Sequence, residues 1–395
     1  VNGAEVVYQG AGPMKGHVLF SKGKLGSEKL AAKSATTRTI ERIADSGGVK
    51  FLDGSGLHKD GPATTISGGR FSDFDPGAPT AYSQIIEAGG DHVTSRGGML
   101  FSQKDLDEMW QEALRETGQG PAVNTSIRKL EETAKKNNSN YSKKYNKNGP
   151  LNADMVHRAL QSGDDTRYWY EIGVEKFRET TRFEDQTLNQ FYSQLVTQSA
   201  KTPVGVDLQR TLALMSDYIS GRPTDVSVIQ RIGTGDAFAL KALSREGTSH
   251  KVTSFEDTHI GLHKGRGERS APMAVNDVVM SNTFGLPETA FADARIYEAV
   301  TRMQNKMRDV LNKNLPVGTE PYTTWQVQAP LWKETRGTSS APSQYANYAE
   351  AMDDIINNKL PQFGIPVKVD AETGAKYIDE ETLRHPLFPE AMGMT

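Results

Sequence analysis

The chain of 395 residues is longer than one average domain, which favours two domains or one domain with long extensions. Its formal net charge of -3 argues against a protein that coats DNA non-specifically, so contact with nucleic acid would need a local basic patch. The chain has no cysteine, which excludes disulfides, thiolate metal sites and cysteine nucleophiles. No stretch approaches the about 20 apolar residues of a membrane-spanning helix, so we expect no membrane span.

Residues 1–104 are rich in glycine, and their apolar runs are short, as at 18–20 and 49–52. Glycine at this density favours turns over regular elements. We therefore expect an irregular N-terminal extension with short strands that is wrapped on a larger body. The chain begins without methionine, which is compatible with a processed product and with a piece of a longer protein.

Residues 105–150 are expected to form a short helix followed by a basic polar linker. The stretch 105–117 has apolar residues at helical spacing, which predicts an amphipathic helix. The stretch 129–150 is rich in Asn and Lys, and we interpret it as a solvated linker or a frayed helix. The alternative is a basic tether to nucleic acid or to a partner, assisted by Tyr141 and Tyr145.

From residue 151 the apolar pattern becomes helical. In 183–200 apolar residues recur at i, i+3, i+4, i+7 and i+8, and the helix predicted in 202–221 ends at Gly221. The stretch 286–316 predicts the longest helix. We expect a mainly α protein with an all-helical core at 151–360, followed at 361–395 by a hairpin and an extended tail.

Several motifs follow one another along the helical part: "RYWYE" from Arg167, "TPVGVD" from Thr202, "HKVTSF" from His250, "VNDVVM" from Val275 and "WQVQAPLW" from Trp325. Their order resembles an uncharacterised helical domain found in long polyvalent proteins of phages and other mobile elements. The resemblance covers roughly residues 164–336. It implies a protein associated with a phage and assigns no chemistry to it.

The same order is distantly similar to the helix-hairpin-helix DNA glycosylases. Those enzymes pair a lysine, which follows a Gly-rich hairpin, with an aspartate that leads the next helix, and they turn the target base into a pocket. The resemblance implies Lys251, or alternatively Lys241, as the lysine and Asp277 as the aspartate. The chain departs from that pattern in its hairpin, in the insertion at 257–272 and in the absence of an iron–sulfur cysteine cluster.

The chemistry of the pair is coherent, and each residue also has a structural interpretation. A desolvated lysine amine at Lys251 can attack C1′ of a sugar, and an aspartate at a helix N-terminus can stay ionised beside an oxocarbenium-like centre. Lysines in such positions more often cover apolar surface with their stems. In the same way, Asp277 before an apolar run is typical of a helix N-cap.

A second candidate site is the loop "HKGRGERS", in which Lys264, Arg266 and Arg269 are interleaved with glycine. Glycine lets backbone amides approach phosphate oxygens, so this pattern is compatible with nucleic-acid binding. The alternative is a solvated surface loop. The loop lacks the spacing of a P-loop.

Two histidines, His259 and His263, have the i, i+4 spacing of metal ligands on a helix. Glycines at 261, 265 and 267 disfavour a continuous helix there, and no glutamate between the histidines provides a catalytic base. We therefore expect no metal site and no cofactor.

Aromatic side chains are the last candidates. Trp169 and its tyrosine neighbours could stack on bases, although aromatic residues in a helical pattern more often belong to the core. The same two interpretations apply to Trp325 and Trp332, with Gln326 and Gln328 as polar lining.

Taken together, the sequence predicts a structural or ejected protein of a phage particle, built on a glycosylase-like helical domain. Its expected partners are other virion proteins, with DNA as a further candidate, and its expected location is the virion or the host cytoplasm. One alternative is a base-excision DNA glycosylase or lyase that uses Lys251 and Asp277. The other is a DNA-binding module without enzymatic activity.

Overall fold

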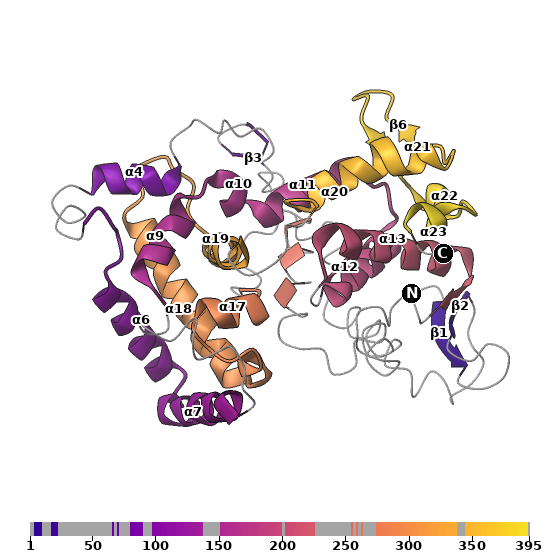
Figure 1. The fold of residues 1–395 in the computed structure, drawn as a ribbon. Coiled ribbons are helices and arrows are strands. Elements are labelled where there is room, and N and C mark those ends of the chain that lie inside the picture. Colours follow the sequence, from indigo (N-terminus) through magenta and orange to yellow (C-terminus); the bar gives the residue numbers. More distant parts are fainter. Residues whose placement is uncertain are drawn as a thin grey trace.

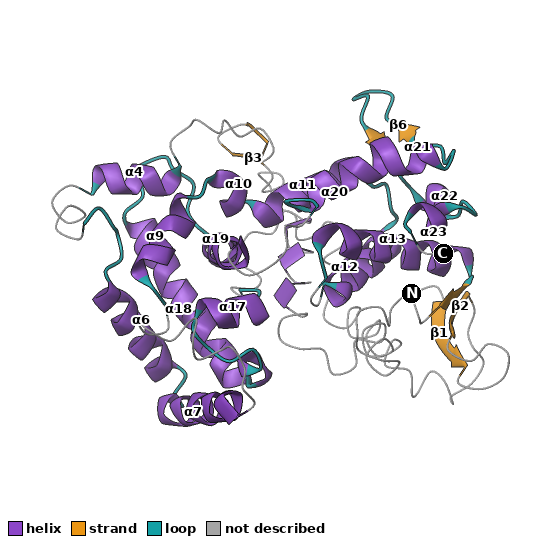
Figure 2. Ribbon diagram, viewed as in Figure 1, coloured by secondary structure: helices purple, strands orange, loops and turns teal. Residues whose placement is uncertain are grey.

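Helices make up most of the described part of the chain in the computed structural model (Figure 1), and short strands are few (Figure 2). The predicted mainly α fold class is therefore confirmed. The structure describes residues 4–9, 17–22, 65–66, 69–70, 80–89, 97–136, 151–199, 202–225, 254–255, 258–259, 262–263, 274–337 and 344–393.

The N-terminal strands form small antiparallel sheets. Strand β2 lies between β1 and β5, so that a strand that follows α13 completes a sheet begun at the N-terminus. Strands β3 and β4 pair with each other. The bounds are β1 Ala4–Gln9, β2 His17–Lys22, β3 Thr65–Ile66, β4 Gly69–Arg70 and β5 Pro223–Asp225.

One group of helices encloses an apolar cluster that we call the α18 core. Its centre is the face of α18 that carries Ile296, Val300, Met303 and Met307, all of them fully buried. The helices around it are α4 Ala81–Ala88, α6 Gln103–Glu116, α7 Gly120–Lys136, α9 Ala153–Gln161, α17 Val278–Thr283 and α18 Ala294–Lys313, with the 3-10 turn η1 Ala290–Ala292.

A second group of helices encloses the α13 core. Leu208, Leu212 and Met215 of α13 lie at its centre and are fully buried. Its elements are α11 Trp169–Thr180, α12 Asp185–Gln198, α13 Val204–Ser220, α20 Tyr348–Asp354, the π-helix η2 Ile355–Lys359, α21 Leu360–Gln362, β6 Lys368–Val369, β7 Lys376–Tyr377, α22 Glu380–Leu383 and α23 Phe388–Ala391; α10 Asp164–Arg167 precedes α11.

Helix α19 (Thr324–Gly337) lies between the two groups, as Figure 1 shows near its centre. It contributes Trp325 and Ala329 to the α13 core, and Val327 and Leu331 to the α18 core. It contacts α9, α17 and α18 on one side and α10 and α11 on the other. The helix therefore buries apolar side chains on opposite faces.

Several predicted elements are found in the structure. Helix α6 covers most of the predicted stretch 105–117. Gly221, the predicted end of the next helix, is the C-cap of α13, and its φ of 64° is the left-handed conformation that glycine adopts readily. Strands β6 and β7 pair within the predicted hairpin. Within the described residues, no helix has the length and apolar character needed to cross a membrane.

The apolar cores extend beyond the stretch 151–360 on both sides. The α18 core begins at Ala81, and the α13 core continues to Met392. Helix α7 extends to Lys136, into the stretch 129–150 that was interpreted as a solvated linker or a frayed helix, and it buries Val123 and Ile127 before that stretch. Two buried apolar positions on a polar helix give a weak periodic signal, which explains why the sequence pattern did not indicate the start of this helix at Gly120.

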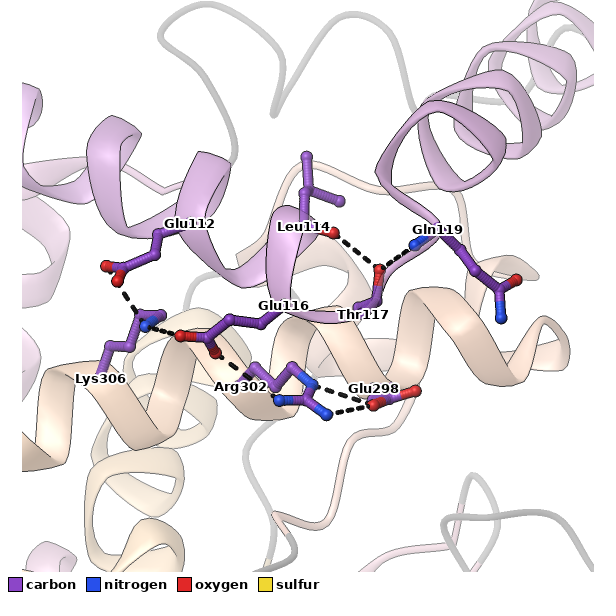
Figure 3. A network of polar contacts seen from close by, with 8 residues as sticks. All are labelled: Glu112, Leu114, Glu116, Thr117, Gln119, Glu298, Arg302 and Lys306. Atoms are coloured by element: carbon purple, nitrogen blue, oxygen red, sulfur yellow. Dashed lines mark hydrogen bonds and ion pairs between the residues drawn. The ribbon is translucent and has the colours of Figure 1, made fainter.

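Helices α6 and α18 are also joined at the surface by an ion-pair network (Figure 3). The Lys306 amine lies 3.2 Å from a carboxylate oxygen of Glu112 and 2.5 Å from one of Glu116, and Arg302 links Glu116 to Glu298. The hydrogen bond from Lys306 holds the pKa of Glu116 below its ordinary value. Since these carboxylates are exposed, the pairs contribute little stability and mainly orient one helix on the other.

The close approach at Gly205 gives a test of core packing. A Cβ atom at Gly205, in the first turn of α13, would lie 2.4 Å from two ring carbons of the buried Tyr345. We expect Gly205→Ala to lower the free energy of unfolding by about 1–3 kcal/mol, because the ring must move within a packed core. Urea unfolding followed by circular dichroism measures this change.

Gly173→Ala is the matched control. A Cβ atom there would lie 3.4 Å from the Cβ atom of Tyr348, an ordinary contact, and alanine is the better helix former. The Gly173 variant should be as stable as the parent protein or more stable. An equal loss of stability in both variants would contradict the packing described for Gly205.

Candidate functional site

A pocket of about 510 Å³, part of it open to solvent, lies where the two helix groups meet along α19. Its lining comes from α11, from the start of α13, from the segments at 255 and 275–277, and from α19 and α20. Most of the lining side chains are aromatic or apolar. The lining residues are Trp169, Tyr170, Ser199, Thr202, Val204, Phe255, Val275, Asp277, Gln328, Ala329, Trp332, Arg336 and Tyr348.

Aromatic rings form the walls of this pocket. The ring of Trp169 lies 6.0 Å from that of Trp332, 5.4 Å from that of Tyr348 and 5.0 Å from that of Tyr170, measured between centroids. The indole of Trp169 also donates a hydrogen bond to the carbonyl oxygen of Ala346. These contacts fix the orientation of the rings, so the pocket offers flat apolar faces to a ligand.

Asp277 is the acidic residue of the pocket, and both of its carboxylate oxygens accept hydrogen bonds. Oδ1 accepts from the backbone amides of Val279 and Met280 at 2.9 and 3.1 Å, so Asp277 is the N-cap of α17. Oδ2 accepts from the indole nitrogen of Trp332 at 3.1 Å. The cap holds the carboxylate in one orientation against an aromatic wall.

Arg336 brings a positive charge to the same pocket. Its guanidinium lies 4.7 Å from the centroid of the Trp332 ring, a distance typical of a cation–π contact. Burial lowers the pKa of Arg336, and the nearby Asp277 carboxylate opposes this effect. Trp332 therefore contacts both charged residues of the pocket, Asp277 at its indole nitrogen and Arg336 over its ring.

Gln328 and Tyr348 complete the polar lining. The side-chain oxygen of Gln328 accepts a hydrogen bond of 2.8 Å from the hydroxyl of Tyr170. The hydroxyl of Tyr348 donates to the buried carboxylate of Asp207 at 2.5 Å. Burial raises the pKa of both tyrosines well above the ordinary value, so both hydroxyls keep their protons.

A buried carboxyl group, Glu171, joins α11 to α19 next to the pocket. Its Oε1 accepts hydrogen bonds of 2.7 Å from the indole nitrogen of Trp325 and from the amide nitrogen of Gln326. Its Oε2 is sealed from solvent and has no hydrogen-bond partner among the described residues. Burial outweighs the two hydrogen bonds and raises the pKa of Glu171 to about 7.

Of the candidate catalytic and base-stacking residues, Asp277, Trp169, Trp332 and Gln328 line the pocket, whereas Trp325 and Gln326 do not. Lys251, Lys264, Arg266 and Arg269 lie outside the described residues, as does the alternative Lys241. Phe255, which follows Lys251 by four residues, lines the pocket. Asp277 has two roles, as the N-cap of α17 and as a lining residue of the pocket.

The histidines considered as metal ligands have other contacts. His259 is fully buried and its Nδ1 donates to the carbonyl oxygen of Phe255, while Nδ1 of His263 lies 2.7 Å from the hydroxyl of Tyr192. Burial lowers the pKa of His259 to about 4. Among the residues with a described structure, no group of three or more His, Asp or Glu side chains is arranged to hold a metal ion.

The charged residue Arg336 and the aromatic residue Tyr348 line the pocket and were not predicted from the sequence. Arg336 lies four residues after Trp332 and eight after Gln328, so helical spacing from the "WQVQAPLW" motif was a signal for it. Tyr348 belongs to another helix, and no local pattern connects it to this motif.

Comparisons with protein families, with curated proteins and with solved structures find no match to this chain. Functional inference therefore depends on the geometry of the pocket and on the motifs of the sequence.

The buried carboxyl group gives a prediction about pH. The pKa of Glu171 is about 7 in the folded chain and near 4.5 when exposed, so between these values the folded state keeps a proton that the unfolded state loses. The contribution of Glu171 to stability is therefore greatest below pH 4.5 and falls as the pH rises to about 7. In Glu171→Gln this dependence should disappear, because the amide carbonyl still accepts the two hydrogen bonds and does not ionise.

Unfolding by urea at several pH values between 5 and 8 measures this effect. The free energy of unfolding of Glu171→Gln, relative to the parent, should increase by about 2–3 kcal/mol across the range. His259 has a lowered pKa and gives the opposite slope below pH 6.5, but this slope is common to both proteins. Parallel curves for the two proteins would show that Glu171 does not titrate in this range.

Proposed function

We propose that the pocket binds a nucleobase that has been turned out of a DNA strand, and that Asp277 assists cleavage of the bond between this base and its sugar. The observation that carries the proposal is the position of the Asp277 carboxylate in a pocket whose walls are aromatic. Aromatic faces bind a base that has left its stack. A carboxylate beside the sugar stabilises the positive charge that develops as the bond breaks.

Asp277 is suited to this role by its place at the start of α17. The two backbone amides that bind Oδ1 hold the carboxylate in a fixed position. The indole nitrogen of Trp332 adds a third hydrogen bond, at Oδ2. A negative charge that is already oriented needs little reorganisation when positive charge develops on the substrate.

Lys251 is the nucleophile in this proposal. It precedes the pocket residue Phe255 by four residues, and the resemblance to the glycosylases implies the same role. Its amine attacks C1′ while the bond to the base breaks, and the base leaves with the bonding electrons and takes up one proton lost by the amine. The C1′–O4′ bond then opens, the second amine proton passes to O4′, and C1′ and the lysine nitrogen form an imine. Lys264, Arg266 and Arg269 would contact the phosphates of the bound strand.

Trapping of the imine tests this proposal. In the presence of borohydride, the protein should form a covalent adduct with an oligonucleotide that contains an abasic site. Lys251→Ala should abolish the adduct. Asp277→Asn should lower the rate of base release from damaged or modified oligonucleotides by about 100-fold or more, because the charge is lost.

Asp293→Asn is the matched control, since Asp293 is also an aspartate N-cap, at the start of α18, and does not line the pocket. Its activity should equal that of the parent protein. The absence of any adduct or base release across a panel of substrates would refute the catalytic proposal. A steep fall of DNA affinity with salt in that case would instead favour the non-enzymatic DNA-binding module.

The biological setting that we propose is a phage particle, in which the chain is a structural or ejected protein. The order of motifs between residues 164 and 336, which resembles the helical domain of phage polyvalent proteins, supports this setting. The Gly-rich residues 1–104 would reach neighbouring virion proteins. This role and the activity of the pocket are compatible, because an ejected protein can act on DNA after it enters the host.

Mass spectrometry of purified particles tests the setting. We expect peptides of this chain in particles of the phage that encodes it, at a level that persists through gradient purification. A host lysate from the same infection, depleted of particles, is the comparison. Detection of the chain in that lysate alone would refute the virion role and leave the pocket chemistry unaffected.

A further inference from the structure

Gln328 has only one of its two polar groups bonded within the protein. Its oxygen accepts the hydroxyl proton of Tyr170, whereas its amide nitrogen has no hydrogen-bond partner among the described residues. The side chain as a whole is 1% exposed. Although the Gln328 nitrogen has no partner, it is not sealed from solvent, and Gln328 lines the pocket. Its N–H groups therefore point into the pocket space.

The orientation of this amide is fixed by Tyr170. Burial raises the pKa of Tyr170, so the hydroxyl keeps its proton and needs an acceptor. Among the described residues, the acceptor is the side-chain oxygen of Gln328, at 2.8 Å. A rotated amide would place its N–H groups against the hydroxyl and leave the tyrosine proton without an acceptor.

The donor lies on the same face of α19 as two other pocket residues. Gln328, Trp332 and Arg336 are spaced four residues apart, which places them in one row along the helix. A flat ring against Trp332 therefore has the Gln328 donor near one end and the Arg336 guanidinium near the other. Both are hydrogen-bond donors, so this row favours acceptor atoms on the edge of the ligand.

We propose that Gln328 selects bases that carry an exocyclic carbonyl oxygen, such as hypoxanthine and uracil, over the corresponding amino bases. This inference rests on the proposed binding of a nucleobase. A carbonyl oxygen accepts the Gln328 N–H, whereas the amino group of adenine or cytosine places a donor against a donor. The mismatch leaves two buried donors without acceptors, which weakens binding by about tenfold or more.

Titration of the full chain with free bases tests the selection. Trp169 and Trp332 line the pocket, so a stacked base should change the tryptophan fluorescence. Hypoxanthine with adenine, and uracil with cytosine, are matched pairs that share a ring frame and differ in the exocyclic group. We expect the oxo member of each pair to bind with a Kd about tenfold or more below that of the amino member.

Two variants connect the selection to the geometry. Gln328→Met has a similar volume without the donor, so the ratio of the two Kd values should approach one. Tyr170→Phe keeps Gln328 and frees its amide to rotate, so the ratio should fall while hypoxanthine still binds. Gln326→Met is the control, because Gln326 is a buried glutamine of the same helix that bonds Glu171 and does not line the pocket; its ratio should match that of the parent.

The outcomes separate this inference from the proposed function. Binding of hypoxanthine and adenine with equal Kd values by the parent protein would refute the selection by Gln328 and leave base binding intact. If Gln328→Met keeps the same ratio of Kd values as the parent protein, the selection by Gln328 is also refuted and base binding remains intact. If none of the four bases binds, the nucleobase pocket itself is refuted, and the role of Gln328 with it. Since the parent ratio is measured without any substitution, a variant that fails to fold does not prevent a decision.

Discussion

Packing on both faces of α19 is the constraint on which the rest of the described structure depends. The helix supplies apolar side chains to the α18 core and to the α13 core, so neither group of helices is complete without it. The carboxyl group of Glu171 then fixes α11 against α19 through two hydrogen bonds, from Trp325 and Gln326. Ionisation of a buried carboxyl group with one bonded oxygen lowers the free energy of unfolding. The Glu171 junction therefore becomes less stabilising as the pH approaches and passes 7.

The pocket follows from this arrangement, because its walls come from both helix groups. Trp332 and Gln328 of α19 face Trp169 of α11 and Tyr348 of α20, while Asp277 approaches from the start of α17. None of these side chains depends on a single loop for its position. The donor, the acceptor and the stacking surfaces are all carried by helices or by a helix cap, as a preorganised binding site requires.

Apolar periodicity indicated α6, α12, α13 and α18 from the sequence, because each buries a regular stripe of side chains. The motif that begins at Trp325 lies within α19, but the sequence does not show in which direction its polar side chains point. Gln326 and Gln328 are two residues apart, about 200° around a helix, so one bonds the buried Glu171 and the other lines the pocket. Both glutamines were candidates for the polar lining of a site. Which of them lines the pocket is decided by the position of α11, because α11 carries Glu171. Asp277 was named as a site residue by the resemblance to the glycosylases and as a cap by its local sequence pattern, whereas Tyr348 reaches the pocket through tertiary packing alone.

The order in which the chain builds its two cores has a practical consequence. The α18 core takes residues from the stretches 81–160 and 280–331, and the α13 core takes residues from 170–275 and 325–392, so the two are interleaved along the chain. No single cut in the gene separates them, and a fragment that retained one core would expose an apolar face of α19. Unfolding of either half removes support from the other, which favours one cooperative transition over stepwise melting. Deletion mapping is consequently unsuited to this protein, and point substitutions are the appropriate way to assign its functions.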